Sequence, residues 1–392
     1  MSRAVASAPP LGATTIAGAT RRDLLQVIAG LGMAVDLEVV GSLTYSAIAT
    51  GALIIYGLAH RPRFTFGRFI WVPAVLGFLL VYLAAVSVFT LQSPLAFSWS
   101  NRLIRLTALT VLAMFLATER LQLRSVVIGM ALGITVNVPL FWLGLVPDTY
   151  GGVLTGYAGD KNTAGMVYSV MTVLALWAAR GRVLRAIILL GGTAAVWMTD
   201  SRTAMMGLLA AMLWMLVAAR RPIPIRWIAA GLLIWLIRVA EQNLAHIGQF
   251  ADRIGSDLLR QRIDSATALK LASTPWWGSG LGEGYVLLGT STWLFHDAYA
   301  VLRVEGGWVF LLGSLAVVIG ICLRPLTPGR EPSRDSTFAQ GAAVALLVTA
   351  WKLGDVFYTV PWALTVGLGT AIALTGARTY SDAALAVSPD DG

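Results

Sequence analysis

The residues with the clearest chemical potential lie in the longest polar stretch of the chain, residues 260–307. It collects one histidine and four cationic residues: Arg260, Arg262, Lys270, His296 and Arg303. Guanidinium groups bind the oxygens of an anion such as phosphate, often through two parallel hydrogen bonds. A neutral imidazole beside that anion can take a proton from a hydroxyl group. The combination predicts a site for an anionic substrate with histidine as its general base.

The elements that must position these residues are hydrophobic helices. Of the 392 residues, 57% are hydrophobic and 12% are charged, which lies outside the range of soluble domains. A transmembrane helix needs roughly 20 mainly apolar residues. The apolar windows are residues 24–40, 43–59, 69–90, 103–117, 124–146, 163–179, 184–199, 203–219, 226–240, 298–323, 337–353 and 356–376. The sequence therefore predicts an all-α polytopic membrane protein with about twelve transmembrane helices.

Arginines set the predicted orientation, because they fall in every second connection between these windows. The groups are Arg21/Arg22, Arg61/Arg63/Arg68, Arg120/Arg124, Arg180/Arg182/Arg185, Arg220/Arg221/Arg226, Arg324/Arg330/Arg334 and Arg378. Basic loops stay in the cytoplasm, so we expect a multi-pass protein of the cytoplasmic membrane with both termini inside. The formal charge of +9 then indicates contact with anionic lipid and no nucleic acid partner.

The domain organisation follows from these windows. We expect residues 1–22 and 381–392 to be disordered cytoplasmic tails and residues 23–380 to form one membrane domain, with an extracytoplasmic loop at about 241–297. Within that loop, apolar residues at helical spacing from Leu244 to Leu258 predict an amphipathic surface helix that includes His246. A single cysteine, Cys322, leaves no intrachain disulfide.

Four of the predicted helices begin at the outer face with a cation at or near the start. These cations are Arg102/Arg105, Lys161, Arg202, and Arg303 with His296. A helix N-terminus exposes unpaired N–H groups and the positive end of the helix dipole, so a cation there is locally unfavourable. If the four starts converge, they form a strong site for phosphate or pyrophosphate. The simpler alternative is that each cation pairs with a local carboxylate: Asp160, Asp200, Asp297 or Glu305.

Other polar features have two interpretations each. The glycine-rich residues 278–284 lack the ending of a nucleotide-binding loop and predict a tight turn at a close backbone approach. Trp276 and Trp277 can stack on sugars or can mark the membrane boundary. Asp36 and Glu38, placed within the first window, can pair with Arg105 or Arg238 or can carry protons. No histidine–carboxylate set has metal-ligand spacing, so we expect no metal.

Several short motifs occur in an order typical of one family. They are GYAGDKNTAG (156–165), TDSRTA (199–204), RIDSATALKLASTPWWGSGLG (262–282), HDAY (296–299) and EGG (305–307). With these motifs the chain resembles the O-antigen ligase and Wzy-type polymerase superfamily, which includes exopolysaccharide polymerisation proteins. The resemblance covers roughly residues 150–320.

The resemblance implies a metal-independent glycosyltransferase without a cofactor, in a membrane-glycosyltransferase (GT-C-like) architecture. Its donor would be a polyprenyl-pyrophosphate-linked oligosaccharide. Its acceptor would be a glycan or lipid-glycan hydroxyl at the outer face of the cytoplasmic membrane. Arg202 and Arg262 would bind the pyrophosphate, His296 would activate the acceptor, and Lys161 and Asn162 match the family's lysine–asparagine element. From residue type and position we add the substrate-binding candidates Arg260, Arg303, Trp276 and Trp277.

Two positions depart from the family pattern. Asp160 stands where exopolysaccharide members often carry histidine, and Asp297 replaces the usual asparagine after the histidine. A carboxylate beside His296 is expected to raise the pKa of that histidine. The rival hypotheses are a twelve-span secondary transporter or lipid-linked glycan flippase, whose midplane polar groups and related halves the sequence lacks, and a non-catalytic scaffold. The sequence leaves open whether the enzyme is a ligase or a polymerase.

Overall fold

The computed structural model describes residues 21–41, 43–90, 93, 95–243, 254–324 and 333–387. It is 72% helical, which confirms the all-α prediction. The helices are α1 (Arg21–Gly32), α2 (Tyr45–Leu58), α3 (Trp71–Phe89), α4 (Trp99–Ala117), α5 (Leu123–Trp142), α6 (Lys161–Ala178), α7 (Arg182–Met198), α8 (Arg202–Leu213), α9 (Ile223–Asn243), α10 (Ile254–Ser273), α11 (Ala298–Val318), α12 (Arg334–Ala350) and α13 (Val360–Val387).

Short elements complete the chain. The one-turn segments η2 (Gly67–Phe69) and η3 (Gly156–Ala158) precede α3 and α6, and the wide turns η4 (Trp214–Ala218) and η6 (Ile319–Leu323) extend α8 and α11. Two antiparallel hairpins join β1 (Glu38–Val40) to β2 (Leu43–Thr44) and β3 (Tyr285–Leu288) to β4 (Ser291–Leu294). In the second hairpin, Tyr285 pairs with Leu294 and Leu288 pairs with Ser291.

Four helical segments in the described part of the chain are long and apolar enough to cross a membrane. They are Gly67–Phe89, Trp99–Ala117, Leu123–Trp142 and Ala298–Leu323. Shorter apolar helices cover Tyr45–Leu58, Arg202–Ala218 and Val360–Gly376. Together they indicate a membrane protein.

The sequence of α3 shows why such a segment suits a hydrocarbon environment. One face, at spacings of three and four residues, is buried: Val72, Leu76, Leu79, Leu83 and Val86. This face packs on α11, where a Cβ added to Gly313 would meet Leu79 at 2.9 Å. The opposite face is also apolar, and Phe78, Val81, Val88 and Phe89 are exposed. A helix that is apolar all round belongs in a membrane or in a large core.

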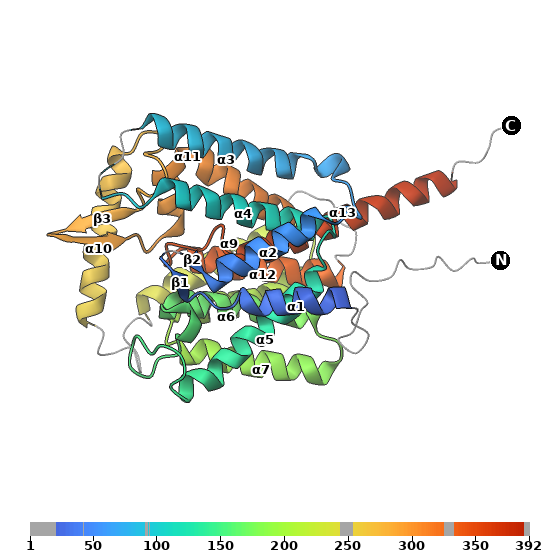
Figure 1. Ribbon diagram of the computed structural model, residues 1–392, viewed down its shortest axis with the longest axis horizontal. Helices are drawn as coiled ribbons and strands as arrows, with labels where there is room; N and C mark the ends of the chain where they lie inside the picture. The colour runs from blue at the N-terminus through green and yellow to red at the C-terminus, as the bar shows by residue number, and fades with distance from the viewer. Residues whose placement is uncertain are drawn as a thin grey trace.

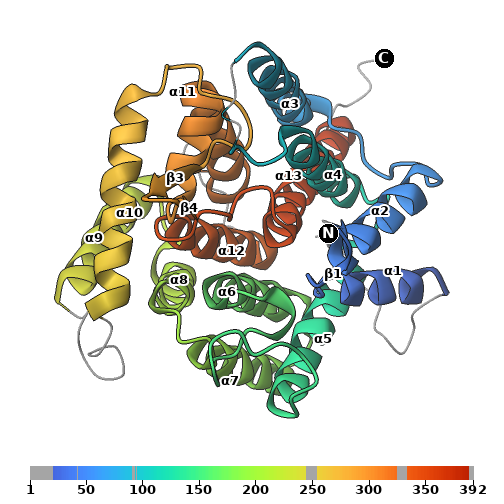
Figure 2. The ribbon, with the colours of Figure 1, turned by 60° about the vertical axis from the view of Figure 1, so that its left-hand side comes forward.

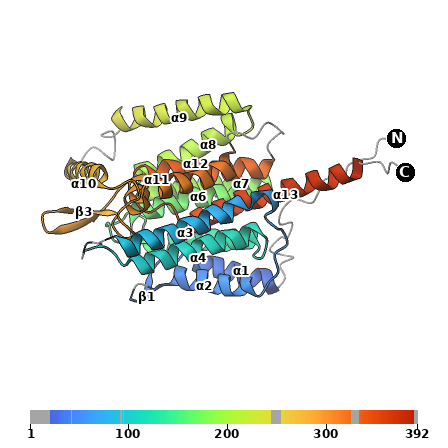
Figure 3. The ribbon, with the colours of Figure 1, turned by 90° about the horizontal axis from the view of Figure 1, so that it is seen from above.

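The centre of the bundle is formed by α6 and α12, with α13 and α4 beside them (Figure 2). Every residue of α6 from Ala164 to Ala178 is buried except Val167. In contrast, α9 runs along the margin of the bundle (Figure 3), and its buried contacts lie with η4 and the neighbouring part of α12. The central helices therefore carry the packing energy and fix the positions of the helix ends.

The connections between helices gather at two opposite ends of the bundle. At one end, which we call the α10 end, lie α10, the β3–β4 hairpin and residues 33–41, 43–44, 95–98, 143–160, 199–201 and 351–359 (Figure 1). Phe97 N donates to Gly282 O at 3.2 Å there, and Leu154 N donates to Met198 O at 2.9 Å. At the other, the arginine end, Arg63 N donates to Thr118 O at 2.9 Å and Arg120 Nη1 to His60 O at 3.1 Å. The alternation of arginine-rich connections thus corresponds to a physical separation of the loops.

The first helix ends earlier than the hydropathy window indicated. α1 stops at Gly32, and Glu38 lies in β1 because the alternating, β-branched run from Val35 to Val40 favours a strand. Asp36 and Glu38 are exposed. Neither proposed partner is theirs: Arg105 pairs with Asp355 at 2.9 Å, and Arg238 lies over the Trp351 ring at 5.2 Å. Of the two alternatives for Asp36 and Glu38, pairing with Arg105 or Arg238 is therefore wrong.

The predicted long outer loop contains a full helix, α10. Residues 244–253, which hold His246 and most of the predicted amphipathic helix, lie outside the described residues. From Ile254 the chain is helical through Ser273, further than the prediction extended.

The glycine-rich turn packs into a break in α11. Gly306 and Gly307 leave the helical conformation, Gly307 at φ +66° and ψ −162°. The carbonyls of Val304 and Glu305 instead accept hydrogen bonds from Ser279 N at 2.7 Å and Gly280 N at 3.0 Å. A Cβ on Gly278 would come within 2.6 Å of Glu305 O. This confirms the turn predicted for a close backbone approach.

Candidate functional site

The N-termini of α6 and α8 lie side by side at the α10 end. α6 begins at Lys161, and Asp160 caps it by accepting hydrogen bonds from Asn162 N at 2.9 Å and Thr163 N at 2.8 Å. α8 begins at Arg202 and is capped by Ser201. The Ser201 hydroxyl also donates to Asn162 Oδ1 at 3.1 Å. That hydrogen bond fixes the two helix starts, with their cations, relative to each other.

The charges of the first turns are partly paired. Lys161 Nζ lies 3.6 Å from Asp200 Oδ2 and 5.4 Å from the centre of the Tyr150 ring. The Tyr150 hydroxyl donates to Asp160 Oδ2 at 2.8 Å. Burial, together with this hydrogen bond and the nearby charge, raises the pKa of Tyr150 to about 12. For Lys161, the local carboxylate partner expected in the simpler alternative is present.

His296 precedes the start of α11 and is half-buried. Its pKa is lowered, first by burial and then by the positive charge of Arg260, while Asp264 and Asp160 oppose the shift and Lys352 adds to it. A lowered pKa leaves the imidazole neutral at neutral pH and able to accept a proton. Because the charge of Asp160 acts on His296, the histidine lies within electrostatic reach of the α6 N-terminus.

Asp297 does not act on His296 as expected. Its carboxylate caps α11, accepting hydrogen bonds from Tyr299 N at 2.8 Å and Ala300 N at 3.3 Å. Burial raises the pKa of Asp297 and these hydrogen bonds counteract that rise. The prediction that Asp297 raises the pKa of His296 was wrong, because the carboxylate is directed at backbone N–H groups of its own helix.

Helix phase decides which arginine of α10 faces the histidine. Arg260 and Asp264, one turn apart, are the α10 residues that affect the His296 charge, and Asp264 Oδ2 lies 3.9 Å from Lys352 Nζ. Arg262 is rotated by about 200° from Arg260 around the helix and is exposed. Within the described residues, Arg262 has no hydrogen bond or ion pair. The structure thus brings Arg260, not Arg262, to His296.

The remaining sequence-predicted residues belong to the turn after α10. Arg303 donates to Pro275 O at 2.8 Å and to Thr274 O at 3.2 Å. Trp276 and Trp277 are 61% and 43% exposed and contact each other edge to face, with ring centroids 5.5 Å apart. The contacts of Arg303 hold this turn against α11, and the tryptophan pair forms an exposed aromatic surface at the α10 end.

A second charged group, which sequence reasoning did not predict as a unit, lies on the other side of the α11 start. Arg102 Nε lies 2.6 Å from Glu305 Oε1, and the same oxygen accepts a hydrogen bond from Gly282 N at 3.0 Å. Arg105 pairs with Asp355, which also lies 3.9 Å from Arg102. Glu305 is only 1% exposed. In the sequence, Glu305 is a lone carboxylate in the motif EGG within a mainly apolar window. That position could have indicated a buried ion pair.

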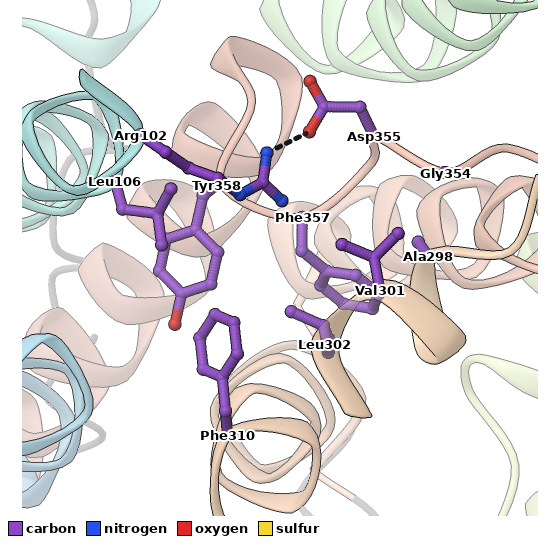
Figure 4. Close-up of a pocket in the computed structure, with 10 residues that line it drawn as sticks. All are labelled: Arg102, Leu106, Ala298, Val301, Leu302, Phe310, Gly354, Asp355, Phe357 and Tyr358. Carbon is purple, nitrogen blue, oxygen red and sulfur yellow. Dashed lines mark ion pairs between the residues drawn. The ribbon is translucent and has the colours of Figure 1, made fainter. Parts of the chain in front are cut away.

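The first turns of α11 line a small pocket together with Arg102 and Asp355 of this charged group. Figure 4 shows Arg102 directed toward Asp355 above Tyr358, Phe357 and Phe310, with Ala298 and Val301 from α11 on the opposite wall. The pocket therefore has a charged rim and an apolar, aromatic floor.

We call the following residues the His296 cluster: Asp160, Lys161, Asn162, Asp200, Ser201, Arg260, Asp264, His296 and Lys352. Its members come from the N-termini of α6 and α8, from the residue that precedes the α11 cap, from one face of α10 and from the segment after α12. Arg202 follows Ser201 as the first residue of α8. In the described part of the chain, no group of three or more His, Cys, Asp or Glu side chains is placed to hold a metal ion. The sequence matches no family model and no curated protein.

Proposed function

We propose that this chain is a membrane glycosyltransferase of the O-antigen ligase and polymerase type. It transfers a glycan from a polyprenyl-pyrophosphate donor to an acceptor hydroxyl at the outer face of the cytoplasmic membrane. The observation that carries this proposal is the position of His296. Burial and Arg260 lower its pKa, and it lies within electrostatic reach of Asp160 at the start of α6, the helix start that Ser201 joins to the start of α8. A neutral base next to an anion site is what this transfer requires.

The proposed reaction breaks one bond and forms one. The acceptor oxygen attacks the anomeric carbon, the bond from that carbon to the pyrophosphate oxygen breaks, and the configuration inverts. His296 takes the hydroxyl proton. The departing pyrophosphate gains negative charge, which Arg202, Lys161 and the N–H groups at the start of α8 stabilise. The chemistry needs no cofactor, because pyrophosphate is already a good leaving group.

The geometry refines the role of the α10 arginines. The resemblance assigns pyrophosphate binding to Arg262, but Arg260 is the arginine that acts on His296. We therefore give Arg260 this role. Arg262→Ala becomes the matched comparison, because it removes the same charge from the exposed side of the same helix.

In this proposal the chain crosses the membrane about twelve times, with the α10 end outside and the arginine end and both termini in the cytoplasm. The segregation of the arginine-rich connections at one end of the bundle supports this orientation.

The proposal is tested by replacing Arg202 with alanine. We expect glycan transfer to fall by about 10²- to 10³-fold, as for loss of one preorganised donor to a developing anion, with the lipid-linked donor accumulating. The matched control is Arg182→Ala, which also replaces the arginine at the first position of a helix, but at the arginine end. Product formation is measured with the purified protein and a defined polyprenyl-pyrophosphate oligosaccharide. Equal rates for the two variants would refute the role of Arg202.

The pH dependence of transfer tests the electrostatics of His296. The base must be neutral, so the rate is expected to fall as the pH drops through its pKa, which is lower than that of a free histidine. Arg260→Gln removes a charge that lowers the pKa, so the acidic limb should move to higher pH. Asp264→Asn removes a charge that raises the pKa, so the limb should move to lower pH. The midpoint of kcat/KM against pH is measured for each variant, and shifts of the same sign in both would contradict this arrangement.

A further inference from the structure

The arginine end contains a second concentration of positive charge, at the C-terminus of α6. Arg124 Nη2 donates to Ala178 O. Arg185 donates to Ala179 O through Nη2 at 3.2 Å and Nε at 3.4 Å. Arg334 Nη2 donates to the same Ala179 oxygen at 3.4 Å. Three guanidinium groups from α5, α7 and α12 therefore converge on two successive carbonyls.

A fourth arginine adds to this charge. Arg180 acts electrostatically on Arg124, as does Arg334, and Arg185 acts on Arg334. The one carboxylate that affects both Arg124 and Arg334 among the described residues is Asp335, whose Oδ1 already accepts a hydrogen bond from Trp177 Nε1 at 3.0 Å. We call these four arginines the α6 arginine cluster: Arg124, Arg180, Arg185 and Arg334.

Capping of the helix accounts for only part of this arrangement. A cation near the C-terminus of a helix is favourable because the exposed carbonyls form the negative end of the dipole. A second and third guanidinium on the same carbonyls add repulsion between like charges. In the described structure Arg185 Nη1, the Nε and Nη1 groups of Arg334 and the whole guanidinium of Arg180 have no acceptor. Such a set of donors is suited to an anion with several oxygens.

The neighbouring surface indicates where the anion comes from. Leu189, one helical turn beyond Arg185 on the same side of α7, is an exposed apolar residue. A ligand whose phosphate contacts the arginines and whose hydrocarbon chain lies along this face of α7 is a phospholipid. An inorganic phosphate would contact the arginines alone. Basic pockets between transmembrane helices on the cytoplasmic side bind lipid headgroups in this way.

We propose that the α6 arginine cluster binds the phosphate of an anionic phospholipid headgroup. The site lies at the opposite end of the bundle from the His296 cluster. It rests on the membrane orientation given with the proposed function but not on glycan transfer.

The test titrates the purified full-length protein in a mild detergent with dioleoyl-phosphatidylglycerol, with the zwitterionic dioleoyl-phosphatidylcholine and with inorganic phosphate, and counts bound molecules by native mass spectrometry. The variant Arg185→Ala/Arg334→Ala removes two members of the cluster. The control Arg182→Ala/Arg221→Ala removes the same charge from exposed arginines at the same end. We expect the first variant to bind phosphatidylglycerol about tenfold or more weakly than wild type and the control to bind it as wild type does.

Three results would overturn the proposal: equal weakening in variant and control, equal binding of phosphatidylcholine, or tighter binding of inorganic phosphate than of the lipid. Circular dichroism and size-exclusion chromatography show whether the double variant folds. If it does not, the same titration is made with Arg180→Ala. The Arg180 side chain makes no hydrogen bond with the described residues, so its removal leaves the fold intact. A folded Arg180→Ala protein with undiminished lipid affinity would likewise contradict the site.

Discussion

Replacing His296 with alanine is expected to lower the rate of glycan transfer by about 10²- to 10⁴-fold, the usual contribution of a general base. The protein should stay folded, because Asp297 rather than His296 caps α11. Donor affinity should change little, since in this account the pyrophosphate is held by Arg202, Lys161 and Arg260. The loss should therefore appear in kcat rather than in KM. Initial rates with the purified variant and a defined lipid-linked oligosaccharide measure both constants.

The control for this experiment is His60→Ala. His60 lies at the arginine end, where its Nδ1 is 2.7 Å from Tyr56 O and its ring packs on the Tyr56 ring. It should transfer glycan at the wild-type rate. A His296→Ala enzyme as active as this control would remove the general base from the account, and would also be the behaviour of a non-catalytic scaffold.

Replacing Arg102 with alanine is expected to destabilise the protein by about 3–5 kcal/mol, the typical cost of leaving a buried charge without its partner. The stranded group would be Glu305, which is 1% exposed and also holds Gly282 N. The effect should spread from there, because Glu305 joins α4, the glycine-rich turn and the break in α11. The measurement is the thermal or denaturant unfolding midpoint in detergent.

Arg105→Ala is the matched control for Arg102→Ala. Its ion pair with Asp355 is solvent-exposed, with side-chain exposures of 47% and 44%, and such pairs contribute about 0–1 kcal/mol. A small change for Arg105→Ala beside a large one for Arg102→Ala is expected. Equal changes would show that the Arg102–Glu305 pair does not stabilise the break in α11.

Hydrophobic windows predicted most of the fold because an apolar run long enough to cross a membrane has few alternatives to a helix. The prediction failed where composition was ambiguous. The run from Val35 to Val40 is apolar enough to extend the first window, yet its alternation with Asp36 and Glu38 favours the strand that forms. The part of α10 beyond Leu258 was not predicted because its charged and polar residues, such as Arg260 and Asp264, lower its hydropathy below that of a span.

The candidate site was only partly predictable for a related reason. The helix starts at Lys161 and Arg202 follow from local capping residues, Asp160 and Ser201, which a sequence displays directly. The choice between Arg260 and Arg262 depends on helix phase, which a segment interpreted as a loop cannot supply. The pairing of Arg102 with Glu305 joins residues from two distant helices, and only the packing of α4 against the α11 region determines it.

The most direct measurement is the fate of a polyprenyl-pyrophosphate-linked oligosaccharide given to the purified wild-type protein, together with a candidate acceptor. The account predicts one polyprenyl pyrophosphate released for each glycan transferred, with inverted configuration at the anomeric carbon. A ladder of products would identify a polymerase, and a single addition to a non-glycan acceptor would identify a ligase. An intact donor that the reconstituted protein merely moves across the bilayer would contradict glycosyl transfer and identify a flippase instead.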